Sequence, residues 1–289
     1  MRNAVQTHRI TAAQFVIVLA LAGIAYANGD VRKDLHFKVG KRPMITIDNP
    51  YGAVVVRAGA AHEVVVTAIL HSDKVEVDQS QSHNRIEIIS HLLSGADVNT
   101  GAVQYEVLVP ADTNLTVHSD NGRVHAEKLH GDLSLDGSNA AMEVVDCGGG
   151  HVHVKTLNGP VNLVNLHDGH VEVMSMGGDV MLNGVSGPLV NINSNSGKIL
   201  YTGDFAGDGE YDFTSHTGDI EAIAPAYASI DVFARSNQGR VDSDFSLEPK
   251  HSSLYTRGGS ALVGTMGKAA SAVKLVSFSG KIHLKKRQN

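Results

Sequence analysis

Tryptophan is absent from this chain of 289 residues, and cysteine occurs only once, as Cys147. A single cysteine excludes any disulfide within the chain, which rules out the disulfide-rich secreted scaffolds. A chain of this length can bury enough apolar surface to fold without such a crosslink. Aromatic residues make up only 5% of the sequence, which disfavours a sugar-binding surface built on stacked rings.

Long apolar runs are also lacking. The longest, residues 15–24, has 10 residues, whereas a helix that spans a bilayer needs roughly 20. Arg2 and Arg9 precede this run, and Ala-Tyr-Ala follows it at residues 25–27. The arrangement is typical of a secretory signal peptide. We therefore predict a signal peptide over residues 1–27 and a mature chain without a transmembrane span, exported to the periplasm, the outer surface or the medium.

Basic clusters of the kind that bind nucleic acid are lacking too. Without Arg2 and Arg9, 22 basic side chains remain against 30 acidic ones, a formal charge of −8. A nucleic-acid surface is basic and clustered, so we expect no nucleic-acid partner.

A short phrase returns every 18 to 21 residues from Ser119 to the end of the chain. It consists of Ser or Thr, two turn residues, Gly and an alternating strand. The copies are SDNGRVHA from Ser119, a degenerate GSNAAMEV from Gly137, TLNGPVNL from Thr156, SMGGDVML from Ser175, SNSGKILY from Ser194, SHTGDIEA from Ser215, SNQGRVDS from Ser236, TRGGSALV from Thr256 and SFSGKIHL from Ser277. A fixed period of this length indicates one structural unit stacked on copies of itself.

Each period contains two strands, one before the Ser or Thr and one after the Gly. Alternation at period two sends every second side chain to one face. The residues predicted to point inward are Leu115, Val117, Leu133, Leu135, Val152, Val154, Val171, Val173, Val190, Ile192, Tyr211 and Phe213 before the corner, and Val124, Met142, Val161, Val180, Ile199, Ile220, Val241, Ala261 and Ile282 after it. Copies about 4.8 Å apart would pair in parallel and share one core. The predicted fold is all-β: a parallel β-solenoid, or β-helix, of about nine or ten coils with 18–21 residues per coil.

The corner between the two strands is predicted from the same alternation. The Ser or Thr points inward, where its hydroxyl can satisfy backbone groups. The residue before the Gly position is Asn121, Asn139 and Asn158 in three successive coils, which suits a tight turn with positive φ at the Asn or the Gly. Just outside the corner, Asp179, Lys198, Asp219 and Arg240 alternate in charge along the expected stack, an arrangement that favours one register.

The N-terminal part of the mature chain lacks the regular period. Residues 28–41 are expected to be a polar lead-in, and residues 42–110 a β module that caps the first coil of the stack. Asn49 takes the Ser place in a sequence that resembles the later phrase, so the first coil is expected there. The predicted organisation is a signal peptide (1–27), an N-terminal β module with the first coil (28–110) and a repeat array (111–289), the last two forming one continuous domain.

Histidine is frequent, with 16 residues, and its densest group is His151, His153, His170 and Glu172. The 19-residue period stacks His170 on His151 and Glu172 on His153. Imidazole and carboxylate groups at strand spacing can converge on Zn²⁺ or another divalent ion. These four residues are therefore candidate metal ligands; the alternative is a pH-sensitive polar patch. No catalytic residue and no other cofactor are expected.

The layout resembles a bacterial family of exported β-strand-repeat proteins labelled "putative adhesins", whose domain has no assigned function. The residues that carry the resemblance are the N-terminal segment, DNPYGAVVV from Asp48, VLVP from Val107 and the S-x-x-G-x-[VI] copies. The resemblance implies a β-solenoid of the cell envelope and supplies no catalytic motif.

The first functional hypothesis is an exported, non-enzymatic β-solenoid that acts as a structural or binding module of the envelope, with an envelope protein or polysaccharide as partner. The second is a polysaccharide-acting enzyme on a parallel β-helix, which would need a groove with acids and aromatic platforms. The third is a divalent-metal-binding envelope protein that uses the histidine group.

Overall fold

The structure, a computed structural model, describes residues 30–206, 208–248 and 260–288. Within these ranges the chain forms 24 β-strands in two 12-stranded sheets and no helix. Accordingly, these ranges contain no helix with the length and apolar character needed to cross a membrane. The predicted signal peptide lies outside the described residues.

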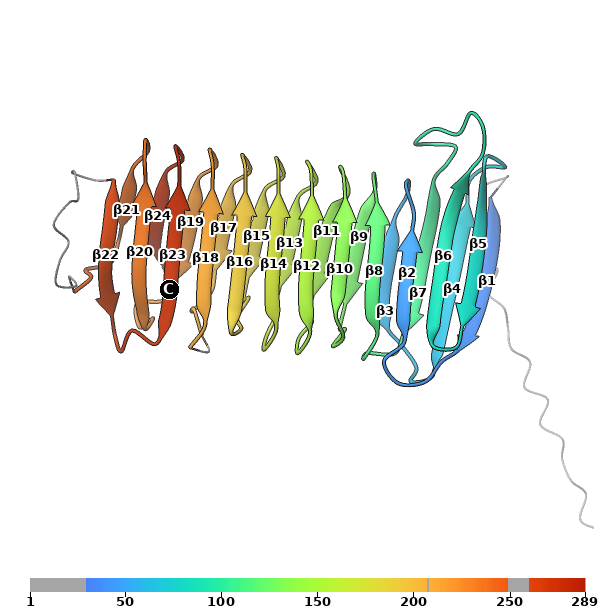
Figure 1. The fold of residues 1–289 in the computed structure, drawn as a ribbon, viewed down its shortest axis with the longest axis horizontal. Coiled ribbons are helices and arrows are strands. Elements are labelled where there is room, and N and C mark those ends of the chain that lie inside the picture. The colour runs from blue at the N-terminus through green and yellow to red at the C-terminus, as the bar shows by residue number, and fades with distance from the viewer. Residues whose placement is uncertain (1–29, 207, 249–259, 289) are drawn as a thin grey trace, which may run out of the picture.

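The two sheets lie against each other along the whole stack (Figure 1). In spatial order, sheet A consists of β1 (Val31–Lys38), β4 (Glu63–Leu70), β7 (Val103–Val109), β3 (Val54–Ala58), β9 (Arg123–Glu127), β11 (Ala141–Val145), β13 (Val161–Val164), β15 (Val180–Asn183), β17 (Ile199–Thr202), β19 (Ile220–Ala224), β24 (Ile282–Lys286) and β21 (Val241–Ser243). In spatial order, sheet B consists of β22 (Ala261–Met266), β20 (Ile230–Ser236), β23 (Ser271–Ser277), β18 (Glu210–Ser215), β16 (Leu189–Ser194), β14 (His170–Ser175), β12 (His151–Thr156), β10 (Leu133–Gly137), β8 (Asn114–Ser119), β2 (Met44–Asp48), β6 (Arg85–Leu92) and β5 (Val75–Ser82).

A coil is one strand of sheet B, a corner and one strand of sheet A, and ten such coils pair in parallel. In most coils the corner is Ser-x-x-Gly or Thr-x-x-Gly; β2–β3, β6–β7 and β10–β11 depart from this phrase. The predicted β-solenoid is therefore confirmed, and each coil has two faces. Val161, Val180 and Ile199 are superposed from coil to coil. The predicted inward residues that precede the corners, from Leu115 to Phe213, are all at most 4% exposed. One hydrophobic cluster runs from Phe37 to Leu284.

Most corner hydroxyls bond to the backbone, as predicted. Ser175 Oγ donates to the carbonyl of Gly178 at 2.6 Å, and Ser194 Oγ donates to the carbonyl of Gly197 at 2.8 Å. These bonds satisfy buried polar groups at the bends. The prediction is wrong for Ser119 and Ser215, whose hydroxyls are buried without a hydrogen-bond partner among the described residues.

The expectation of positive φ at the corner Asn or Gly is confirmed at Gly122 and wrong at the corners of Asn139 and Asn158. Gly122 has φ +137°, whereas Gly159, Gly178 and Gly197 lie outside the left-handed region. Glycine is needed there because the corners of adjacent coils touch: a Cβ on Gly178 would lie 2.0 Å from the carbonyl oxygen of Gly159.

The C-terminal coils are not stacked in chain order, so the prediction that each coil packs on the next coil of the sequence is wrong at this end. The last coil, β23–β24, lies between β18–β19 and β20–β21. Ser277 pairs with Ser215 on one side and with Ser236 on the other. The repeat determines the register in which two coils pair but not which coils pair, because these coils carry similar corners and the same alternation. β22 pairs antiparallel with β20, so Ala261 begins an edge strand, not a coil; Thr256 lies outside the described residues.

A similar displacement occurs at the N-terminal end. The coil β2–β3, expected around Asn49, is confirmed, and it lies between β6–β7 and β8–β9. β1, β4 and β5 complete this end in antiparallel pairing. The segment expected to be a polar lead-in contains strand β1. Pairing with β4 supplies the backbone hydrogen bonds of this strand, and Phe37 is buried in the hydrophobic core. Both the first and the last coil of the chain are thus enclosed by other coils.

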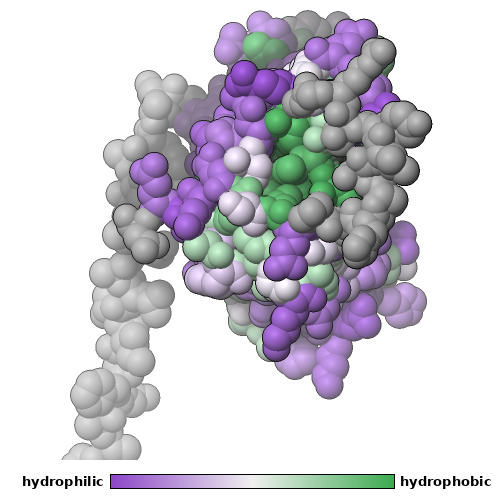
Figure 2. All heavy atoms as spheres, turned by 90° about the vertical axis from the view of Figure 1, so that its left-hand side faces the viewer, coloured by the Kyte–Doolittle hydropathy of each residue, from purple (hydrophilic) through white to green (hydrophobic). Residues whose placement is uncertain are grey.

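Apolar residues gather at the centre of the C-terminal end of the stack, within a hydrophilic rim (Figure 2). Phe245, Leu247, Leu262 and Met266 are partly buried and pack against the core at this end.

Candidate functional site

The predicted histidine group forms two pairs on the outer face of sheet B. His151 pairs in register with His170, and His153 pairs with Glu172. The rings of His151 and His170 lie 4.7 Å apart, centroid to centroid, at 71°. His153 Nδ1 lies 3.3 Å from Glu172 Oε2. The predicted stacking of these four residues is confirmed.

The two pairs do not converge on one point. Within the described ranges, no group of three or more His, Cys, Asp or Glu side chains is arranged to hold a metal ion. Zn²⁺ binding requires three or four ligands at about 2.0–2.2 Å for nitrogen and oxygen. Metal binding by these residues stays a prediction, and it would require the ion to draw the two pairs together.

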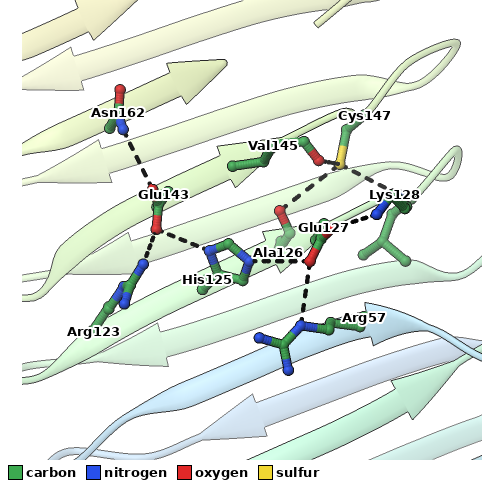
Figure 3. A network of polar contacts seen from close by, with 11 residues as sticks. Arg57, Arg123, His125, Ala126, Glu127, Lys128, Glu143, Val145, Cys147 and Asn162 are labelled. Atoms are coloured by element: carbon green, nitrogen blue, oxygen red, sulfur yellow. Dashed lines mark hydrogen bonds and ion pairs between the residues drawn. The ribbon is translucent and has the colours of Figure 1, made fainter. Parts of the chain in front are cut away.

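A network of charged side chains occupies the outer face of sheet A on β9 and β11 (Figure 3). His125 lies at its centre, with Nδ1 2.9 Å from Glu143 Oε2 and Nε2 3.6 Å from Glu127 Oε2. Arg123 donates to the same Glu143 oxygen as His125, and Asn162 Nδ2 donates to the other at 3.4 Å. This network was not predicted, although the 18-residue spacing of these two coils places Glu143 on His125 in register.

Both carboxylates in this network favour the ionised form. The Arg123 and His125 hydrogen bonds hold the pKa of Glu143 below its ordinary value. The Lys128 ammonium, 2.5 Å from Glu127 Oε1, is the main cause that lowers the pKa of Glu127, and Arg57 adds a bond at 3.2 Å. A general acid needs a raised pKa, so these groups are suited to cross-coil pairing and not to proton donation.

We expect Glu143→Gln to reduce the sensitivity of the fold to acid. A lowered folded-state pKa means that ionised Glu143 stabilises the protein fully above its ordinary pKa of 4.5, and that this contribution is lost as the pH falls through the folded-state value. Between pH 6 and pH 2.5, the variant should lose less stability than the wild type, by about 1 kcal/mol. Urea unfolding at both pH values measures the difference.

Glu106→Gln is the control, because Glu106 is exposed on β7 in the same sheet. It should lose as much stability in acid as the wild type does. Equal acid losses for Glu143→Gln and the wild type would contradict the pairing role of Glu143.

The predicted charge ladder is altered by the order of the coils. Lys281, directly before β24, and not Arg240, follows Asp219 in space, and its backbone N–H donates to Asp219 Oδ1 at 2.7 Å. The N–H of Lys198 donates to Asp179 Oδ1 in the same way, at 2.8 Å. The aspartates therefore fix register through backbone amides.

Cys147 is buried, and its Sγ accepts the N–H of Leu129 at 3.3 Å. Burial raises the pKa of the Cys147 thiol, which disfavours the thiolate that a nucleophile requires.

A groove follows the Ser-x-x-Gly corners on the sheet B side. Its larger part, about 480 Å³, extends across the corners from β12 to β20. The residues directly before and after each corner Ser or Thr line it. Four of these residues are large, apolar and between 41% and 54% exposed: Leu157, Met174, Met176 and Phe278. The ring of His216 stacks on that of Phe278 at 5.1 Å and 5°.

The groove continues toward the N-terminal end as a second part of about 380 Å³. Lys155 and Leu157 line both parts. Beyond them the lining becomes polar and includes Asp48, Asp120 and Asp136. We call the two parts the apolar half and the acidic half of the corner groove.

The backbone at these corners is already paired between coils. The N–H of Met176 donates to Thr156 O at 3.1 Å, and the N–H of Phe278 donates to Ser215 O at 3.1 Å. A ligand in the groove therefore meets side chains, and its affinity must come from apolar burial and charge.

The corner groove was not predicted from the sequence. A signal was present: alternation makes the residue before each corner Ser face outward, and at Met174 and Val276 that outward residue is apolar. Only the spatial order of the coils, which brings Phe278 next to His216, shows that Phe278 lines the same groove as Met174 and Met176.

Residues 44–285 match the family model described as Toastrack DUF4097. Three solved structures are similar. A "putative adhesin" from Bacteroides fragilis NCTC 9343 is 17% identical, over 92% of this chain and 100% of that one, with a TM-score of 0.44. A "putative adhesin" from Parabacteroides merdae ATCC 43184 is 12% identical, over 89% and 96%, with a TM-score of 0.40. A "putative cell adhesion protein" from Clostridium sporogenes ATCC 15579 is 12% identical, over 89% and 100%, with a TM-score of 0.29. No curated protein sequence matches the chain.

Proposed function

Since this chain belongs to the Toastrack DUF4097 family, we propose that it is an exported, non-enzymatic binding module of the cell envelope and that the corner groove is its binding site. The N-terminal sequence pattern supports export. The rigid stack holds the groove open along its length, so that a ligand can meet many coils at once.

The observation that carries the proposal is the apolar half of the groove. Leu157, Met174 and Met176 lie on two neighbouring coils and are between 44% and 54% exposed. Phe278, 41% exposed, lines the same half of the groove beyond the corners of Asn195 and His216. Large apolar side chains that gather on a surface mark interaction sites more often than scattered ones do. Methionine adapts its shape to a bound surface, which suits a recognition site.

The alternative of a polysaccharide-acting enzyme has less support from the acidic side chains of the protein. The densest group of acids, around His125, consists of paired carboxylates with lowered pKa values. Glycosidic cleavage by two carboxylates requires one of them to hold a proton. Turnover of acidic glycans by the purified protein would overturn the non-enzymatic proposal.

We expect Met176→Glu to weaken binding of the purified mature chain to cell-envelope fractions by about tenfold or more, because a charge would enter the apolar half of the groove. Co-sedimentation with the fractions measures this. Met181→Glu is the matched control, since Met181 is 41% exposed on β15 in the other sheet, and it should bind as the wild type does. Absence of binding by the wild type, or equal binding by Met176→Glu, would refute the proposal.

A further inference from the structure

We infer that the ligand of the corner groove is an extended polypeptide segment with apolar side chains in one half and basic side chains in the other. This inference rests on the proposed function, because it names the occupant of the same site. The groove is continuous through Lys155 and Leu157, so one segment can occupy both halves.

The length of the groove suits a short extended segment. Its lining reaches from β2 to β20 across nine neighbouring strands of sheet B. Eight steps of about 4.8 Å give roughly 38 Å, and an extended chain rises about 3.4 Å per residue. About 11 residues would therefore fill the groove.

The apolar half selects against a sugar. A sugar ring binds by stacking on the free face of an aromatic ring, and Phe278 is the one aromatic residue among those that line the described groove. His216 already covers a face of that ring, at 5.1 Å and nearly parallel. Met174, Met176 and Leu157 offer no flat platform, but they can surround the branched or aromatic side chains of a peptide.

The acidic half selects against anionic ligands. Asp48, Asp120 and Asp136 line it within three neighbouring coils, with His118 between two of them. Asp120 Oδ1 accepts the Ser138 hydroxyl at 2.8 Å, which orients the carboxylate at the groove. Lys155, at the junction of the halves, is the register neighbour of Asp136, so the negative charge is concentrated at Asp48 and Asp120. An anionic lipid or an acidic glycan would be repelled there, whereas Lys or Arg of a peptide would be attracted.

The test begins with a phage-displayed library of random 12-residue peptides, selected on the mature wild-type chain with Met176→Glu as the counter-selection. We expect the selected peptides to carry Leu, Phe or Met in one half and Lys or Arg in the other. A synthetic selected peptide should bind Met176→Glu about tenfold more weakly than the wild type and Met181→Glu equally well. The double variant Asp120→Lys/Asp136→Lys should also bind it about tenfold more weakly, and should instead prefer the same peptide with Glu in place of its basic residues.

Glu106→Lys is the control for positive charge added away from the groove, because Glu106 is exposed on sheet A, and it should leave peptide affinity unchanged. Selected peptides without this division into two halves, or with equal affinity for Met176→Glu, would overturn the inference. So would phosphatidylglycerol vesicles or peptidoglycan fragments that bind in a Met176-dependent manner when no peptide does. If envelope fractions bind at the groove and peptides do not, the inference fails and the proposed function stands; if the fractions do not bind either, both fail.

Discussion

Gly178→Ala is expected to destabilise the protein by about 3 kcal/mol or more, although it adds only a methyl group at the surface end of a coil. The new Cβ would lie 2.0 Å from the carbonyl oxygen of Gly159, and both groups belong to backbone that is paired with its neighbours. Neither coil can move away without breaking the hydrogen bonds and core contacts on both sides. The strain therefore spreads along the stack. Urea or thermal unfolding of the purified mature chain measures the loss.

Gly177→Ala, one residue earlier, is the matched control. A Cβ there would lie 3.1 Å from Asn158 Oδ1, the end of a side chain that can rotate. The backbone of Gly177 also lies outside the left-handed region. We therefore expect the free energy of unfolding to change by no more than about 0.5 kcal/mol. Similar losses for the two variants would show that the corners of adjacent coils are not in close contact, and the stacking described above would be wrong.

Leu275→Asp is expected to release the C-terminal end of the stack while the middle coils stay folded. Leu275 is fully buried in β23 and lies between Phe213 of β18 and Ala234 of β20. A carboxylate at this position costs about 4 kcal/mol or more, because it is buried without a partner. Since β23–β24 joins β20–β21 to the rest of the stack, its loss detaches a coil that precedes it in the chain.

Amide hydrogen exchange measures this effect segment by segment. In Leu275→Asp, the amides of β20 to β24 should exchange rapidly and those of β8 to β15 should keep their protection, as expected when each coil contacts only its neighbours. Lys274→Gln is the control. Lys274 points outward and pairs with Asp212 at 2.6 Å, half exposed, so we expect a loss of less than about 1 kcal/mol. Protection of β20 in Leu275→Asp would contradict the enclosed position of the last coil.

Much of the architecture could be predicted because the coil is a local unit. Alternation within four to six residues determines which side chains point inward, and the Ser-x-x-Gly phrase marks each bend. Val152 and Val171 could be placed in the core, and His170 on His151, because the 19-residue period fixes register directly. The same period places Glu172 on His153.

Convergence of side chains on a site could not be predicted in this way. The period places His153 beside Glu172 but does not determine whether the side chains of two pairs meet at one point, which depends on rotamers and on the flatness of the sheet. The network around His125 was missed because its members come from four strands, β3, β9, β11 and β13. The corner groove was missed because its lining residues are adjacent in space and dispersed in the repeat.

By itself, the sequence determined the two-strand coil, its buried face and its register, because these depend on period-two alternation and on the residues at one bend. Only the tertiary structure decided the order in which the coils stack. Equivalent coils offer the same hydrogen-bonding edge and the same apolar face to any neighbour, so local chemistry does not distinguish one partner from another. That order encloses the first and last coils and places Lys281, instead of Arg240, beside Asp219. It also places Phe278 against His216, which completes the groove on which the proposed function rests.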